Sequence, residues 1–148
     1  MILSDVVAAL VTTFDAALSV PVVDGPQPAS VAYDRYVTVG ATGEPGDTAA
    51  ASLEPSDLGP GTWRDEFGSV DCAAWAWSGG TDIPTLRAAA LDLAEQCLNA
   101  VWADRTLGGL LQMPGATTGE VRYEPAQTDK GAIVRVTFTV AYQALVTT

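Results

Sequence analysis

The strongest constraint on the fold is the two-residue alternation near the end of the chain, from Gly131 to Val146. From Val134 to Tyr142 every second side chain is large and apolar, and the intervening positions are smaller or polar: Val134, Val136, Phe138, Val140 and Tyr142 against Arg135, Thr137, Thr139 and Ala141. Successive side chains of a strand point to opposite faces, so this pattern predicts a long strand with one face against a core. Such a strand requires a sheet and elements that cover its apolar face.

Three further segments have the composition of strands. The run Ala32–Val39 is rich in Tyr and Val, which favour extended structure. Ser69–Trp77 alternates, but both of its faces carry apolar groups, as expected for a strand inside a sheet that is covered on both sides. Glu120–Pro125 is joined to the last strand by Gln127–Gly131, whose residues favour a tight turn, and this predicts a hairpin.

Two segments have helical periodicity. Apolar residues recur at spacings of three and four from Leu3 to Leu18, where Ser4 or Asp5 is suited to cap or charge the first turn. The second helix is expected from Ile83 to Trp102, with Asp82 at the capping position and Pro84 in the first turn.

Residues 40–68 have a different composition, with six glycines, three prolines and a single basic residue, Arg64. The segment also holds six acids: Glu44, Asp47, Glu54, Asp57, Asp65 and Glu66. Glycine and proline disfavour regular elements, so we expect a long acidic loop inserted into the domain.

These elements together predict an α+β fold. We expect one domain over residues 1–148, built from an antiparallel sheet of about four strands packed against two α-helices, with the 40–68 loop as an insertion. A length of 148 residues is typical of a single domain with its own apolar core.

The charge of the chain argues against several classes of partner. Eighteen acidic and seven basic residues give a formal charge of −11, which repels nucleic-acid phosphates and anionic lipid. No apolar run approaches the roughly 20 residues that cross a bilayer. We therefore expect neither specific nucleic-acid binding nor membrane association.

The residues usually needed for catalysis or metal binding are scarce. The chain has no histidine, which is the commonest general base and metal ligand. Cys72 and Cys97 lack the spacing of a zinc site and are expected to be buried, reduced thiols. The pairs Gly79-Gly80 and Gly108-Gly109 lack the flanking residues of a phosphate loop. We expect no catalytic residue, no cofactor and no metal, although a carboxylate or calcium site among the acids of 40–68 stays open as an alternative.

The tryptophans are the best candidates for contacts between molecules. Trp75 and Trp77 share one face of a predicted strand, and paired aromatic residues there form core or interface more often than a ring-binding site. Trp63, near the end of the acidic segment, either anchors that segment locally or inserts into a neighbour.

Several phrases of the sequence resemble the tail terminator proteins of long-tailed bacteriophages (siphophages). They are the strand end Trp75-Ala76-Trp77-Ser78-Gly79, the Ile83–Trp102 helix, the turn Thr106-Leu107-Gly108-Gly109 and the closing strand from Gly131 to Val140. The first helix followed by Val23-Asp24-Gly25-Pro26 is similar too. The resemblance covers most of the chain except residues 40–68.

The resemblance implies a structural virion protein without enzymatic activity. Members of the family form a ring, usually a homohexamer, that caps the head-proximal end of the tail tube, stops its polymerisation and offers a docking surface to the filled head. The implied partners are the chain itself, the tail tube protein and a head-completion or connector protein, with DNA passing through the lumen. The implied location is the virion tail, after assembly in the host cytoplasm.

On this reading, we expect subunit contacts through Trp75, Trp77 and the turn Leu107, Gly108, Gly109, Leu110 and Leu111. The six acids of residues 40–68 are expected to face the lumen or a partner. Two alternatives stay open: another head-tail joining protein or a tail tube subunit, and, from a different class, a small metal- or ligand-binding domain.

Overall fold

The computed structural model describes residues 1–27, 33–43, 50–57, 63–112 and 115–147. In these ranges the chain forms two helices and six strands, in the order α1 (Leu3–Ala17), β1 (Val22–Asp24), β2 (Arg35–Val39), β3 (Ala51–Asp57), β4 (Trp63–Ser78), α2 (Ile83–Ala103), β5 (Ala116–Thr128) and β6 (Gly131–Thr147). The two predicted helices and the long final strand are therefore confirmed.

The six strands form one mixed sheet in the order β1-β2-β4-β6-β5, with β3 also paired to β4. β1 and β2 are parallel, and all other pairs are antiparallel. The prediction of an antiparallel sheet of about four strands is thus wrong in both number and direction. β1 was not predicted, because a strand of three residues directly after Pro21 is too short to show a periodic pattern.

The prediction of one long acidic loop at residues 40–68 is also wrong. Residues 51–57 form β3, and β4 begins at Trp63, six residues before the predicted start. β3 pairs with residues 64–70 of β4, on the edge where β2 pairs with residues 72–76. An edge strand needs partners on one side only, so β3 tolerates Pro55 and the solvent-facing Glu54, which would disfavour a central strand.

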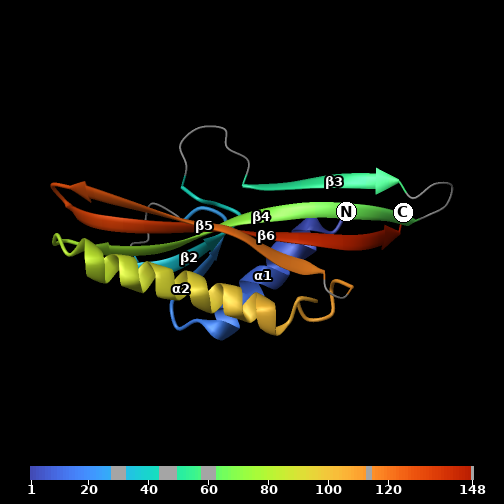
Figure 1. Ribbon diagram of the computed structural model, residues 1–148, viewed down its shortest axis with the longest axis horizontal. Coiled ribbons are helices and arrows are strands. Elements are labelled where there is room, and N and C mark those ends of the chain that lie inside the picture. Colours follow the sequence, from blue (N-terminus) through green and yellow to red (C-terminus); the bar gives the residue numbers. More distant parts are fainter. Residues whose placement is uncertain (28–32, 44–49, 58–62, 113–114, 148) are drawn as a thin grey trace.

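Both helices cover the same face of the sheet (Figure 1). Val6, Leu10 and Phe14 of α1 are fully buried, and α2 buries a stripe of seven residues, from Leu86 to Val101. These side chains meet the alternating apolar face of β6, where the rings of Phe14 and Phe138 pack edge to face at 6.1 Å between centroids. The predicted face of β6 from Val134 to Tyr142 is buried, as expected.

The start of α2 is built as predicted. The Asp82 carboxylate accepts the Thr85 backbone N–H at 3.2 Å and the Thr85 hydroxyl at 2.6 Å, and Pro84 lies in the first turn. In contrast, the first helix has Ile2 at its N-cap position and no side-chain cap. Asp5 contributes only its charge to that first turn.

Both cysteines are free and buried in the core, as predicted. Burial raises the pKa of the Cys72 thiol well above its ordinary value and that of Cys97 to about 12. Both thiols therefore stay protonated at neutral pH, and a protonated thiol is a poor nucleophile.

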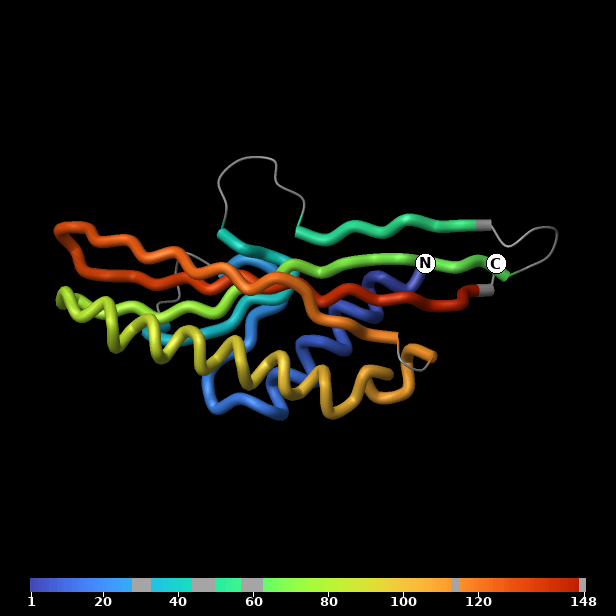
Figure 2. Tube along the Cα trace, viewed as in Figure 1, coloured from blue at the N-terminus to red at the C-terminus, as the bar shows by residue number. Residues whose placement is uncertain are grey.

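β4 and β6 pair along the whole of β4 and form a long ribbon, about 50 Å at 3.3 Å per residue. Figure 2 shows the β5-β6 hairpin extending to one end of the molecule and the paired ends of β3, β4 and β6 to the other. The molecule is therefore elongated along its sheet, with surfaces at both ends that lie outside the central core.

Candidate assembly surfaces

The face of the sheet opposite the helices is formed by the odd-numbered residues of β4 and β6, because the two strands pair in register. Trp63, Phe67, Trp75 and Trp77 all lie on this outer face. The predicted placement of Trp75 and Trp77 on one strand face is therefore confirmed, although their surroundings differ.

Trp75 contacts neighbouring side chains of its own chain. Its ring is stacked on Tyr36, with 5.6 Å between centroids and 9° between planes. The indole N–H donates to Thr38 Oγ1 at 3.2 Å, and the Arg135 guanidinium lies 5.8 Å from the ring centroid. Trp75 is consequently half-buried, and partial burial raises the pKa of Tyr36 beside it.

Residues 41–43, which follow β2, also pack against the Trp75 side of the sheet. Thr38 Oγ1 donates to the Ala41 carbonyl at 2.7 Å, and Arg135 Nη1 donates to the Thr42 carbonyl at 2.7 Å. Gly43 has a left-handed φ of +74°, and a Cβ at this position would lie 2.5 Å from Trp75 Cη2. Arg135 is also paired with Glu124 of β5. These contacts make the Trp75 region part of the folded subunit.

Trp77 is more accessible, with 43 % of its surface exposed. It lines an open hollow of about 530 Å³ between the end of β4 and the start of α2, together with Asp34, Arg35, Asp82 and Thr85. Of the two tryptophans predicted from this strand, Trp77 is the one with a large exposed surface.

The opposite end of the outer face carries a second group of exposed apolar side chains. Trp63, Phe67 and Leu145 are 50 %, 43 % and 38 % exposed, and we call these three residues the ribbon patch. Leu145 pairs with Asp65, so Trp63 and Phe67 lie on the two diagonals from it, within reach of large side chains. Beside Phe67, residues 52–54 and 67–69 border a shallow hollow of about 440 Å³.

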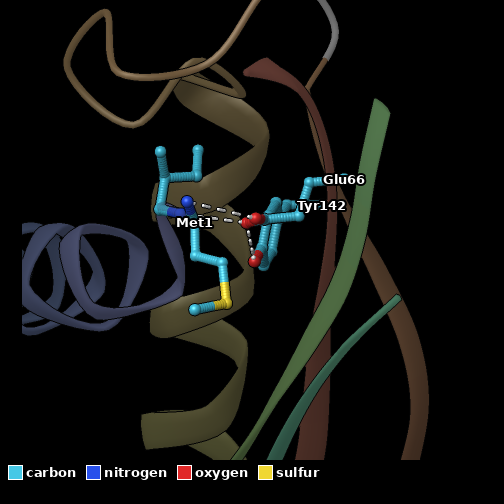
Figure 3. A network of polar contacts seen from close by, with 4 residues as sticks. Met1, Glu66 and Tyr142 are labelled. Carbon is cyan, nitrogen blue, oxygen red and sulfur yellow. Dashed lines mark hydrogen bonds and ion pairs between the residues drawn. The ribbon is translucent and has the colours of Figure 1, made fainter. Parts of the chain in front are cut away.

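Beneath the ribbon patch, on the helix-covered face, a buried carboxylate joins three elements. Tyr142 donates its hydroxyl to Glu66 Oε2 at 2.7 Å, and the Ile2 backbone N–H donates to the same oxygen at 3.1 Å (Figure 3). The Met1 ammonium lies 3.9 Å from Glu66 Oε1. Burial and then the contacts to Glu66 raise the pKa of Tyr142. This network fixes the start of α1 against the ribbon.

The turn predicted to make subunit contacts folds against its own subunit. Leu107 and Leu111 are each only 4 % exposed and belong to the core, whereas Gly108 and Gly109 are exposed and Leu110 is partly buried. Asp104 holds the turn by accepting the backbone N–H groups of Thr106 at 3.0 Å and Gly108 at 2.9 Å. Hydrogen bonds from Thr106 and Gly108 lower the pKa of Asp104.

The six acids predicted to share one loop are placed on different elements. Glu54 and Asp57 belong to β3, whereas Asp65 and Glu66 belong to β4. Glu54 is exposed, and Glu66 is only 3 % exposed. Glu44 and Asp47 lie outside the described residues. The acidic segment therefore does not act as one exposed surface, because Glu66 faces the core.

A further apolar surface was not predicted from the sequence. Leu91 and Trp102 of α2 and Val121 and Tyr123 of β5 are between 38 % and 49 % exposed, and we call them the helix patch. Trp102 donates its indole N–H to Thr118 at 3.1 Å, and the Arg87 guanidinium lies 5.9 Å from the Tyr123 ring centroid. Trp102 directly follows the fully buried Val101 and lies on the exposed side of α2.

Within the described ranges, no group of three or more Cys, Asp or Glu side chains is arranged to hold a metal ion. No helix found there has the length and hydropathy of a membrane span. The sequence matches no protein-family model and no curated protein.

Proposed function

We propose that this protein is a structural subunit of a long-tailed bacteriophage virion, a tail terminator. Copies would form a ring on the head-proximal end of the tail tube, end its polymerisation and present a docking surface to the head. The partners in this proposal are further copies of the chain, the tail tube protein and a head-completion or connector protein, and DNA passes through the lumen without specific binding.

One observation carries the proposal: three of the four tryptophans lie at the surface of the subunit. Trp63, Trp77 and Trp102 are 50 %, 43 % and 49 % exposed. Tryptophan buries a large area on binding and is enriched at the centres of protein interfaces. The three residues lie on different parts of the molecule, which is what a subunit with several neighbours requires.

The negative charge is compatible with a DNA channel. Eighteen acids against seven basic residues give the chain a net charge of −11, and like charge repels a phosphate backbone. DNA would therefore slide past such a ring, whereas a basic lining would retain it by releasing counterions. Glu54, exposed on β3, is one candidate for the lumen, but Glu66 is not, because its carboxylate is buried.

The test is the growth of tail tubes from purified tube protein, followed by electron microscopy. A terminator is expected to bind one end of each tube and to stop elongation there, so tubes are shorter with the protein than without it. Incorporation along the tube would instead favour the alternative of a tail tube subunit. Tubes that grow normally with no protein at their ends would overturn the proposal.

The alternative of a metal- or ligand-binding domain has a separate test. Binding to the folded state raises the melting temperature by mass action. If calcium or magnesium at millimolar concentration raises the melting temperature, the metal-binding alternative is favoured over a purely structural role.

A further inference from the structure

The register of the sheet shows which backbone groups are free at its edges. Asp71 donates its N–H to the Ala50 carbonyl, so odd-numbered residues of β4 form hydrogen bonds toward β3. In an antiparallel pair, residues alternate between hydrogen-bonded and non-hydrogen-bonded positions. Pro55 pairs with Glu66, an even-numbered residue, and its nitrogen therefore faces the open edge.

The edge formed by β5 also carries a proline whose nitrogen faces outward. Gln143 donates its N–H to the Gly115 carbonyl, so odd-numbered residues of β6 form hydrogen bonds toward β5. Pro125 pairs with Val134, and its nitrogen faces outward. β5 also has an irregularity between Thr118 and Val121, and β1 at the remaining edge is only three residues long. Prolines, bulges and short strands all hinder the addition of a further strand.

These features disfavour the addition of a strand at the edges of β3, β5 and β1, and this favours association of copies through faces. The ribbon patch lies on the outer face, at the end formed by β3, β4 and β6. The helix patch lies on the other side of the sheet: Val121 and Tyr123 pair with Phe138 and Val136, which are core residues. Leu91 follows Arg87 by one turn of α2, and Trp102 follows Leu91 by about three turns.

The charges beside the two patches differ. Asp65 lies between Trp63 and Phe67 of the ribbon patch, and Glu54 pairs with Phe67 from β3. The helix patch instead has Arg87 over its Tyr123 ring. More broadly, residues 1–86 hold twelve acids and two basic residues, whereas residues 87–148 hold six acids and five basic residues. Contact of one ribbon patch with another would bring the most acidic regions together.

We infer that copies of this chain associate head to tail, with the ribbon patch of one copy on the helix patch of the next. Two different surfaces meet in such a heterologous contact. The copies at the two ends of a growing chain each keep one free patch, and growth stops when a ring closes. This inference rests on the proposed function, because it names the surfaces that would build the terminator ring.

Two variants test the inference, one for each patch. The ribbon variant carries Trp63→Ser and Phe67→Ser, and the helix variant carries Leu91→Ser and Trp102→Ser. Each is expected to weaken self-association by about thirtyfold or more, as loss of a central interface tryptophan does. Tyr33→Ser, which removes an exposed ring outside both patches, is the control and should leave association unchanged.

Mixing the two variants gives the sharpest result. The helix variant keeps an intact ribbon patch and the ribbon variant an intact helix patch, so the mixture should form heterodimers that grow no further. Sedimentation or light scattering measures the masses, and melting temperatures confirm that each variant is folded. A milder pair, Leu145→Ser and Leu91→Ser, carries the same expectation if the double variants do not fold.

The inference is overturned if the wild-type chain stays monomeric, if either folded variant associates like the wild type, or if the mixture forms no heterodimer. These outcomes are distinct from failure of the proposed function. A head-to-tail oligomer that does not bind tail tubes would remove the proposed function and leave this inference standing. A chain that caps tail tubes but associates through other surfaces would remove this inference and leave the proposed function standing.

Discussion

The hydroxyl of Tyr142 donates a 2.7 Å hydrogen bond to the carboxylate of Glu66, at a site where both side chains are buried beneath the outer face of the sheet. The Ile2 N–H donates to the same carboxylate, so one acid links α1, β4 and β6. Because the ribbon patch lies on the other side of the same strands, this network supports the surface on which the proposed assembly depends.

Replacing Tyr142 with Phe is expected to lower the free energy of unfolding by about 1–3 kcal/mol. The substitution removes one donor from a buried carboxylate and leaves that carboxylate partly unsatisfied. Urea denaturation measures the loss. Tyr123→Phe is the matched control, because the Tyr123 side chain is 40 % exposed, and its effect should stay within about 0.5 kcal/mol. Equal effects of the two substitutions would contradict the role assigned to the Tyr142 hydroxyl.

A Gly68→Ala substitution tests the packing of the same tyrosine. Gly68 pairs directly with Tyr142, and a Cβ at this position would lie 2.2 Å from Tyr142 Cε1. We expect a loss of about 1–3 kcal/mol, as for overpacking of a core. Gly119→Ala is the control, because the nearest atoms to its Cβ are 3.8 Å away. If Gly68→Ala is no worse than Gly119→Ala, the ring does not pack on the glycine as described.

Stability is expected to fall at alkaline pH. Burial raises the pKa values of Cys72, Cys97 and Tyr142 above those of the unfolded chain, so the folded state resists losing these protons. This stabilisation is complete below the unfolded pKa values of about 8.5–10 and is lost progressively as pH rises above them. Each thiol contributes a slope of about 1.4 kcal/mol per pH unit in that range.

Urea unfolding between pH 7 and pH 11 measures this dependence, and a Cys97→Ala variant provides the comparison. The variant should be less stable at pH 7, because it loses buried volume, but its stability should fall less steeply above pH 9. An unchanged slope in the variant would show that Cys97 does not titrate differently in the folded and unfolded states.

The outward-facing prolines predict a change of aggregation behaviour. Replacing Pro55 and Pro125 with Thr restores an N–H on each open edge, so strands of neighbouring molecules can then pair there. We expect slow, irregular association with increased thioflavin fluorescence, and a change in stability of no more than about 1 kcal/mol. Pro84→Ala, in the first turn of α2, serves as control and should not aggregate. A double variant that behaves like the wild type would show that the prolines do not protect the edges.

The elements whose bounds were predicted most accurately are those whose pattern depends on one strong period. β6 alternates without interruption from Val134 to Tyr142, and α2 combines helical spacing with the Asp82 cap and Pro84. In these segments the local preference of the sequence and the demands of the core agree.

β3 could not be predicted, because its stability comes from pairing with β4 and not from its own residues. The segment Ala51–Asp57 contains Glu54, Pro55 and Asp57, which disfavour strands when judged locally. The register between β3 and β4 allows this strand to form, since it turns the Pro55 nitrogen to the open edge. No local pattern reports that register.

The candidate surfaces were predicted only in part. The shared face of Trp75 and Trp77 followed from alternation, but the coverage of Trp75 by Tyr36, Arg135 and the segment near Gly43 depends on contacts distant in sequence. Leu107 and Leu111 had the apolar character of an interface, and the fold uses them in its own core. The helix patch depends on the register between β5 and β6, which places Val121 and Tyr123 on the face that carries α2 and which no local pattern reports.

The proposed assembly of the chain into a ring is tested most directly by the mass of the purified protein, measured by size-exclusion chromatography with light scattering. Exposed tryptophans on separate surfaces predict a closed oligomer with one defined mass that does not grow with concentration, and the resemblance implies six subunits. A protein that remains monomeric at high concentration, with the tail tube protein also present, would contradict it.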